Sequence, residues 1–250
     1  HVASVAGGGH TAVLGATRAT SPLHRGQVAM LPRAAGRLRT AGYAVLAAWA
    51  SPAHEGYVQP KAQSLRTIGL SAGCRLRTAA CASADDPLVA TGAWEAQQPG
   101  HWPDFPEVVR ALNKEVRRSA QPGLAAATVF YACGTDHASK CGLWRGMGER
   151  GVVVVPRAGE TARAERPDQR VCVAAPCDGA DAALSSTKLR QALKARDVAG
   201  LSSMVSPAAA RLLLRPTADE FRSFENDYRQ LGVSAPAQEE AAGPGTPTPP

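Results

Sequence analysis

Gly151-Val152-Val153-Val154-Val155 is the longest uninterrupted β-branched apolar run in the chain. A strand that is apolar on both faces is typical of the inside of a parallel sheet, which helices cover on both sides. Shorter apolar runs of similar character predict further strands at 11–14, 43–49, 75–80, 128–133 and 171–174. The quadruple valine therefore predicts the central layer of the fold.

Segments with helical apolar spacing alternate with these strands. In the first of them, Val28, Leu31 and Leu38 are the expected inward positions. The predicted helices are 24–38, 62–72, 106–118, 186–196 and 207–214. Alternating strands and helices predict an α/β fold with a doubly wound parallel sheet and right-handed crossovers. Ligands of such sheets bind beyond the carboxyl ends of the strands, where 15–27, 134–136 and 185–190 are expected.

Length and composition predict one main globular domain. The chain has 250 residues, 44% of them hydrophobic, and no apolar run approaches the ~20 residues of a membrane span. We expect an N-terminal extension at 1–10, a main domain at 11–216 and a C-terminal helix or arm at 217–235. The stretch 236–250 is rich in Pro, Gly, Ala and Thr, which predicts a disordered or extended tail.

The net charge of +7 suits a polyanionic ligand such as ATP, a nucleic acid or an acidic neighbour in an assembly. Nucleic acid is not expected, because the basic residues are scattered and only 5% of residues are aromatic. Six cysteines form no CxxC pair, so we expect no metal site and read them as core thiols.

The first 54 residues contain five arginines and no acidic residue, and the chain begins at His1. Such an arginine-bearing, acid-poor bias is typical of organelle transit sequences, although this stretch also overlaps the candidate site. We therefore expect a mitochondrial matrix location ahead of cytosol or nucleus.

The segment from Gly15 to Gln27 follows the first predicted strand. A glycine turn, small residues such as Ala16 and a helix start would form a cradle of backbone N–H groups for an anion. His24 and Gln27 are three residues apart and share a face of the first helical turn. A pair of imidazoles there would stabilise charge on a triphosphate. The alternative is that His24 is only a polar residue at a helix start.

The second segment is Leu184-Ser185-Ser186-Thr187-Lys188-Leu189-Arg190. Ser185 or Ser186 is a natural N-cap, and the first-turn N–H groups, the hydroxyls and the Arg190 guanidinium could hold phosphate oxygens. The alternative is an ordinary capped helix on the surface.

Three shorter segments could complete a nucleotide site. Asp136, in Cys133-Gly134-Thr135-Asp136, could bind a ribose hydroxyl or a metal, or it could cap a turn. The indoles of Trp94-Glu95 and Leu143-Trp144 could stack on a cationic ring, or they could be core tryptophans. Arg157 could bind phosphate, or it could be a solvated loop charge.

These motifs, in this order, resemble the nicotinamide/nicotinate mononucleotide adenylyltransferases of the eukaryotic type, from about residue 11 to residue 214. Pro22-Leu23-His24-Arg25-Gly26-Gln27 is similar to the family's (H/T)xGH segment. The other matches are Gly42-Tyr43, Ser51-Pro52 and Gly56-Tyr57 (GY…SP…Y), Trp94-Glu95 with Trp102 (WE…W), 133–136 (CGxD), Leu143-Trp144 (LW), 157–159 (RAG) and 184–190 (ISSTxIR).

The resemblance implies a Rossmann-like nucleotidyltransferase domain of the HxGH type. The enzymes transfer the adenylyl group of ATP to the mononucleotide, forming NAD or its deamido form and pyrophosphate, with Mg²⁺ held mostly through ATP. The resemblance places His24, Gln27 and Arg190 at catalytic positions. It places ATP or its phosphates at Gly15, Ala16, His24, Gly134, Asp136, Ser185, Ser186, Thr187 and Arg190. It places the mononucleotide at Trp94, Glu95, Leu143, Trp144 and Arg157.

Three departures from the family pattern fall on the triphosphate side. Gln27 stands where the family has its second histidine, the loop from Gly15 to Pro22 is about three residues longer, and a lysine-rich run is reduced to Lys61 after Pro60. Loss of one donor to a developing charge typically costs about 10²–10³ in rate. The alternative function is therefore an inactive or weakly active homologue, a nucleotide-binding or structural accessory subunit of a larger, plausibly mitochondrial, assembly.

Overall fold

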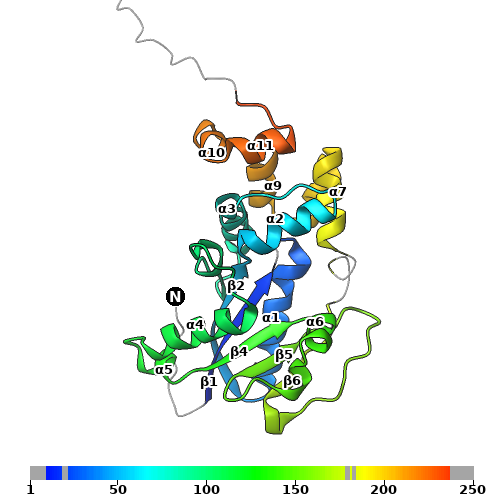
Figure 1. The fold of residues 1–250 in the computed structure, drawn as a ribbon. Helices are drawn as coiled ribbons and strands as arrows, with labels where there is room; N and C mark the ends of the chain where they lie inside the picture. Colours follow the sequence, from blue (N-terminus) through cyan, green and yellow to red (C-terminus); the bar gives the residue numbers. More distant parts are fainter. Residues whose placement is uncertain (1–9, 19–21, 178–180, 182–183, 237–250) are drawn as a thin grey trace, which may run out of the picture.

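The computed structural model describes residues 10–18, 22–177, 181 and 184–236. Its centre is a six-stranded sheet in the order β3-β2-β1-β4-β5-β6, in which every neighbouring pair is parallel (Figure 1). In chain order the strands are β1 (His10–Arg18), β2 (Tyr43–Pro52), β3 (Val89–Thr91), β4 (Thr128–Cys133), β5 (Gly151–Val154) and β6 (Val171–Val173). This arrangement confirms the predicted α/β fold with a parallel sheet.

Helices cover both faces of the sheet, which makes it doubly wound. On one face, α1 (Arg25–Thr40) and α3 (Ala72–Ser83) pack over a core that includes Leu14 and Val153. On the other face, a core that includes Val13 and Val152 is covered by α4 (Phe105–Arg117), α5 (Pro122–Ala125) and α6 (Thr135–Lys140). Consecutive strand residues point to opposite faces, so a continuous valine run fills both cores.

The chain after β6 forms a group of helices that shares a third core. These helices are α7 (Ser186–Ala195), α8 (Val198–Met204), α9 (Pro207–Leu214), α10 (Ala218–Ser223) and α11 (Glu225–Leu231), and they surround Leu70 and Cys74. The helix or arm predicted at 217–235 is thus a pair of short helices. Residues 1–9 and 237–250, where the extension and the tail were predicted, lie outside the described residues.

The segment between β2 and β3 differs from its prediction. A helix was expected at 62–72 and a strand at 75–80, but the structure has α2 (Glu55–Ser64), a connection, and then α3 over the whole predicted strand. Ser71 caps α3, because its Oγ accepts a hydrogen bond from the Cys74 N–H at 3.2 Å. The buried side chains of Cys74 and Thr78 then lie one helical turn apart. The strand prediction was wrong because this run contains one β-branched residue only.

Strand β1 is longer than predicted. It pairs with β2 up to Arg18, and Gly15 lies opposite Trp49 and Tyr131 within the sheet. The expected glycine turn at Gly15 is therefore wrong. A side chain at this position would be 2.8 Å from Leu112 Cδ2, so a glycine here lets α4 approach the strand closely.

Other predictions fit the structure closely. The predicted inward positions Leu31 and Leu38 of α1 are buried, and Val28 packs against the same core. Cys74, Cys133 and Cys177 are buried, as expected of core thiols, whereas Cys141 is exposed. Among the described residues, the helices are all too short or too polar to cross a membrane. Strand β3 and helices α5, α6 and α8 were not predicted.

Candidate functional site

A cavity of about 150 Å³ lies at the carboxyl edge of the sheet and is lined by residues from four separate segments. We call it the phosphate cleft. Its lining residues are His24, Gly26, Gln27, Met30, Gly134, Val155, Pro156, Arg157, Cys177, Asp181, Leu184, Ser185 and Ser186. Six of them were predicted as site residues from the sequence: His24, Gln27, Gly134, Arg157, Ser185 and Ser186.

Three helices begin at the phosphate cleft. His24, Gly134 and Ser185 are the N-cap residues of α1, α6 and α7, and all three line the cavity. The first turn of a helix has N–H groups without intrahelical partners and carries the positive end of the helix dipole. Their convergence gives the cleft the electrostatic character of an anion-binding site.

Gln27 is bound to the backbone at the start of α1. Its Oε1 accepts a hydrogen bond from the backbone N–H of His24 at 3.2 Å, which is one half of a capping box. The His24 side chain is buried at the same helix start. The position where the family pattern has a histidine is thus occupied here by a neutral residue with a local structural contact.

Gly26 lets the segment after β6 approach α1. A Cβ on Gly26 would lie 2.6 Å from the backbone oxygen of Asp181, a distance that no side chain tolerates. The Arg25 side chain holds the same segment, because its Nε lies 3.8 Å from Asp181 Oδ1. Arg25 also donates a hydrogen bond to the backbone oxygen of Ser203. Close packing at this wall of the cleft thus explains why the sequence motif has a glycine at position 26.

Ser185 and Arg157 supply donors on the remaining walls. Ser185 Oγ accepts the Lys188 N–H at 3.2 Å, which leaves its hydroxyl proton to donate to a ligand. Arg157 follows β5 and is exposed, and its guanidinium forms no ion pair with any residue in the described part of the chain. A guanidinium in this position can bind a phosphate oxygen.

Five residues predicted to bind ATP do not line the cleft: Arg190, Thr187 and Asp136, and also Gly15 and Ala16, which line another cavity. Arg190 is buried beneath the first turn of α7, and its Nη2 donates to Thr187 Oγ1 at 3.3 Å. Burial lowers the pKa of Arg190, and its Nε has no hydrogen-bond partner within the described residues. Thr187 and Asp136 are both exposed and lie outside the lining. Their assignment to ATP stays a prediction.

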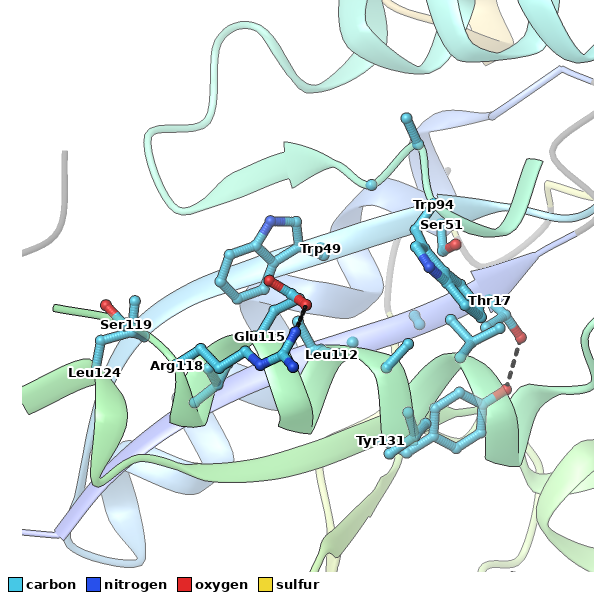
Figure 2. A pocket seen from close by; sticks show the side chains of 18 residues that line it. Thr17, Trp49, Ser51, Trp94, Leu112, Glu115, Arg118, Ser119, Leu124 and Tyr131 are labelled. Carbon is cyan, nitrogen blue, oxygen red and sulfur yellow. Dashed lines mark hydrogen bonds and ion pairs between the residues drawn. The ribbon is translucent and has the colours of Figure 1, made fainter. Parts of the chain in front are cut away.

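A larger cavity, of about 470 Å³, lies between α4 and the sheet (Figure 2). We call it the α4 groove. Its lining residues are Gly15, Ala16, Thr17, Trp49, Ser51, Gly92, Ala93, Trp94, Val108, Val109, Ala111, Leu112, Glu115, Val116, Arg118, Ser119, Leu124 and Tyr131. Gly15 and Ala16, predicted for ATP, and Trp94, predicted for the mononucleotide, are therefore here and not in the phosphate cleft.

The two predicted ring-binding tryptophans do not face one site. Trp94 is 43% exposed and lines the α4 groove. Trp144 is in the core beside Leu143, and its Nε1 donates to Ser139 Oγ at 3.2 Å. The expectation that these two indoles flank one pyridine ring is not met in this structure, in which Trp144 and Leu143 have the core role left open by the sequence.

Glu95 belongs to a buried polar network behind the α4 groove. Ser51 Oγ donates to Glu95 Oε2 at 2.8 Å. Burial raises the pKa of Glu95 to about 8, although the bond from Ser51 and the charge of Arg75 oppose that rise. Arg75 is fully buried and donates to the backbone oxygens of Leu70 and Ala53. The sequence did not predict a buried role for Arg75, since residues 75–80 were expected to form a strand.

The sequence also did not predict a chain of three hydrogen-bonding side chains. Thr17 Oγ1 and Tyr131 Oη are 3.1 Å apart, and Tyr131 Oη is 3.3 Å from His137 Nε2. The three residues come from β1, β4 and α6. No spacing in the sequence relates them, because strand pairing alone brings Thr17 and Tyr131 together.

Comparison with known proteins supports the fold. No family model and no curated protein matches this chain. Among solved structures, the chain is similar to the nicotinic acid mononucleotide adenylyltransferase of Plasmodium falciparum complexed with APC, with a TM-score of 0.51 and 8% sequence identity. The match covers 87% of this chain and 98% of the other. At this identity the similarity establishes a Rossmann-like, nucleotidyltransferase-like fold and no more.

Proposed function

We propose that this chain binds ATP by its phosphates in the phosphate cleft and transfers the adenylyl group to nicotinamide or nicotinate mononucleotide. One observation carries the proposal: the N-termini of α1 and α7, the exposed Arg157 and the hydroxyl of Ser185 converge on one cavity at the carboxyl edge of a parallel sheet. Ligands of parallel sheets bind at this edge, and helix N-termini favour anions there.

The proposed reaction needs no covalent enzyme intermediate. A phosphate oxygen of the mononucleotide attacks the α-phosphorus of ATP, a new P–O bond forms, and the bond to the β-phosphate breaks with release of pyrophosphate. The residues of the cleft would orient the triphosphate and stabilise its charge, which is the main contribution that a protein makes to such a transfer. Mg²⁺ would add charge neutralisation, held largely by ATP itself, and Asp181 is the carboxylate that the described lining residues could offer it.

The choice of acceptor is supported by the family resemblance of the motifs and by the name of the similar Plasmodium enzyme. Trp94 is the one predicted ring-binding indole that is exposed enough to meet a ligand. An indole face attracts a flat cationic ring. We place the pyridine ring of the acceptor against Trp94.

A second candidate function is nucleotide binding without turnover, in an accessory subunit of a larger, mitochondrial assembly. Gln27 favours it, because an amide stands where the family pattern has a histidine, and an amide can donate a hydrogen bond to a phosphate but never a positive charge. The burial of Arg190 also favours nucleotide binding without turnover, because it keeps this guanidinium out of the cleft lining.

Two measurements on the purified chain separate these functions. Calorimetric titration with ATP and Mg²⁺ tests binding, and NAD formation from ATP, Mg²⁺ and nicotinamide mononucleotide tests transfer. Binding with turnover supports transfer, whereas binding without turnover, with activity gained in Gln27→His, supports the second function. Absence of ATP binding would contradict both.

The contribution of Arg157 provides a matched test of the cleft. Arg157→Ala should weaken ATP binding about tenfold or more, because a charge-assisted hydrogen bond contributes ~1.5–3 kcal/mol. Arg117→Ala is the control, since Arg117 is exposed at the end of α4 and does not line the cleft. Equal ATP affinity of the two variants would place the triphosphate elsewhere.

A further inference from the structure

We propose that the α4 groove binds an elongated, uncharged, mostly hydrocarbon molecule with one hydrogen-bonding head, which lies at Thr17 and Tyr131. Trp94, against which the acceptor ring is placed above, is one residue of its lining. The site goes beyond the proposed function, because it extends from there under α4 to Leu124, which precedes β4 (Figure 2). The phosphate cleft shares none of its lining residues.

The groove has the dimensions of a binding site for an extended molecule. Its lining includes Val108 and Val116, whose separation along α4 corresponds to roughly 12 Å at ~1.5 Å per residue, and it continues past the helix end to Ser119 and Leu124. Its volume of about 470 Å³ is within the range of small-molecule sites, roughly 300–1,000 Å³.

Apolar side chains form the walls along this length. Trp49 from β2 lies on one side and Leu112 from α4 lies on the other, with Leu124 at the far end (Figure 2). Val116 of α4 is also in the lining. Gly15 and Ala16 are also in the lining, and Leu112 packs close to Gly15. A hydrocarbon chain would remove these walls from water, which is the main driving force for binding in such a site.

The charges of the lining favour an uncharged ligand. The lining contains one acid and one base, and they pair with each other, since Arg118 Nη1 lies 3.6 Å from Glu115 Oε1. An ionised ligand would meet no unpaired opposite charge in the lining. A charged group in an apolar site without a partner binds poorly because of its desolvation.

The polar groups suited to a head lie at the other end. The hydroxyls of Thr17 and Tyr131 are 3.1 Å apart and form part of the lining (Figure 2). Ser51 Oγ is also in the lining and donates to Glu95, and Tyr131 Oη also lies 3.3 Å from His137 Nε2. A hydroxyl or carbonyl head can join the pair formed by Thr17 and Tyr131, which orients the hydrocarbon chain toward Trp49 and Leu124.

The test uses the full chain and dodecanol brominated at its terminal carbon, because bromine quenches a nearby indole. We expect saturable quenching of tryptophan fluorescence that is largely lost in Trp49→Phe and retained in Trp102→Phe. Trp102 does not line the groove and serves as the matched control. Quenching that survives in Trp49→Phe, or that does not saturate, would overturn the proposal.

Two further variants test the wall and the head. Ala111→Phe fills the groove and should weaken binding at least roughly tenfold, whereas Ala120→Phe, at an exposed residue outside the lining, should leave it unchanged. Thr17→Val keeps the shape but removes the hydroxyl, and should weaken binding several-fold. The proposal would be overturned if all variants had equal affinities for dodecanol. It would also be overturned if dodecanoate bound as tightly as dodecanol, or if naphthalene bound and dodecanol did not. ATP titration of the same variants reports on the phosphate cleft separately.

Discussion

Gln27 Oε1 lies 3.2 Å from the backbone nitrogen of His24 and accepts its hydrogen bond. This contact ties the neutral residue of the motif to the start of α1, directly beside the phosphate cleft. A residue at this position therefore has two separable effects, one on the stability of the helix start and one on the charge that a ligand meets.

Replacing Gln27 by leucine should remove the acceptor and lower the free energy of unfolding by about 0.5–2 kcal/mol, the usual range for a lost cap. Gln27→Glu keeps an acceptor oxygen and should retain most of the stability. Urea unfolding followed by circular dichroism measures both. Equal stability of the leucine and glutamate variants would show that the contact has no structural role.

Two glycines of α1 should respond to alanine in opposite directions. In Gly26→Ala the new Cβ would be 2.6 Å from the backbone oxygen of Asp181, so we expect a loss of about 1–3 kcal/mol and weaker ATP binding. A methyl group on Gly36 would meet no neighbouring side chain or segment within 4 Å, so Gly36→Ala should stabilise the helix by about 0.5–1 kcal/mol. Thermal unfolding of both variants checks the sign, and a stabilised Gly26→Ala would contradict the close packing.

Glu95 should make the protein less stable as the pH rises. Burial raises the pKa of Glu95 to about 8 from its usual value of 4.5, so the folded state keeps a proton that the unfolded state releases. Between these values the free energy of unfolding should fall with pH, by at most about 1.4 kcal/mol per pH unit from this residue.

Glu95→Gln removes this titration and should flatten that part of the stability profile. Glu225→Gln changes an exposed glutamate that is paired with Arg229, and it should keep the wild-type profile. Urea unfolding across the window gives the comparison. A Glu95→Gln profile as steep as that of wild type would mean that another group controls the pH dependence.

Asp227 should be important for the attachment of the last helices. Its two carboxylate oxygens accept hydrogen bonds from the Ser71 N–H at 2.7 Å and from Ser71 Oγ at 2.6 Å, and it is buried. Asp227→Ala should cost about 2–4 kcal/mol and make 217–236 more susceptible to limited proteolysis. Asp219→Ala changes an exposed aspartate and should cost less than about 0.5 kcal/mol. Equal losses in both variants would contradict this role.

The fold was largely predictable because its signals are local. Runs such as 151–155 can be buried only between two layers of helices, and their alternation with helical segments determines the sheet type. The helix starts at His24 and Ser185 were also local, since apolar spacing predicts the first helix and a cap serine marks the second. These starts are the part of the candidate site that the sequence located.

The remainder of the site depends on contacts between distant segments. Whether Trp144 faces a ligand or the core depends on the position of Ser139 and the helices around it. Gly15 looked like a turn because glycine often ends a strand, but the pairing of β1 with β2 continues to Arg18. Arg75 is helical because Ser71 caps α3. The local β-propensity of its segment did not predict this helix.

The sheet ends in two very short strands. β3 (Val89–Thr91) and β6 (Val171–Val173) have three residues each and form the two edges. An edge this short offers few unpaired backbone groups to another chain, which protects a parallel sheet from aggregation by strand addition. Self-association or assembly with other proteins would therefore use side-chain surfaces. The molecule can also expose its apolar α4 groove without the risk of aggregation that an open strand edge would bring.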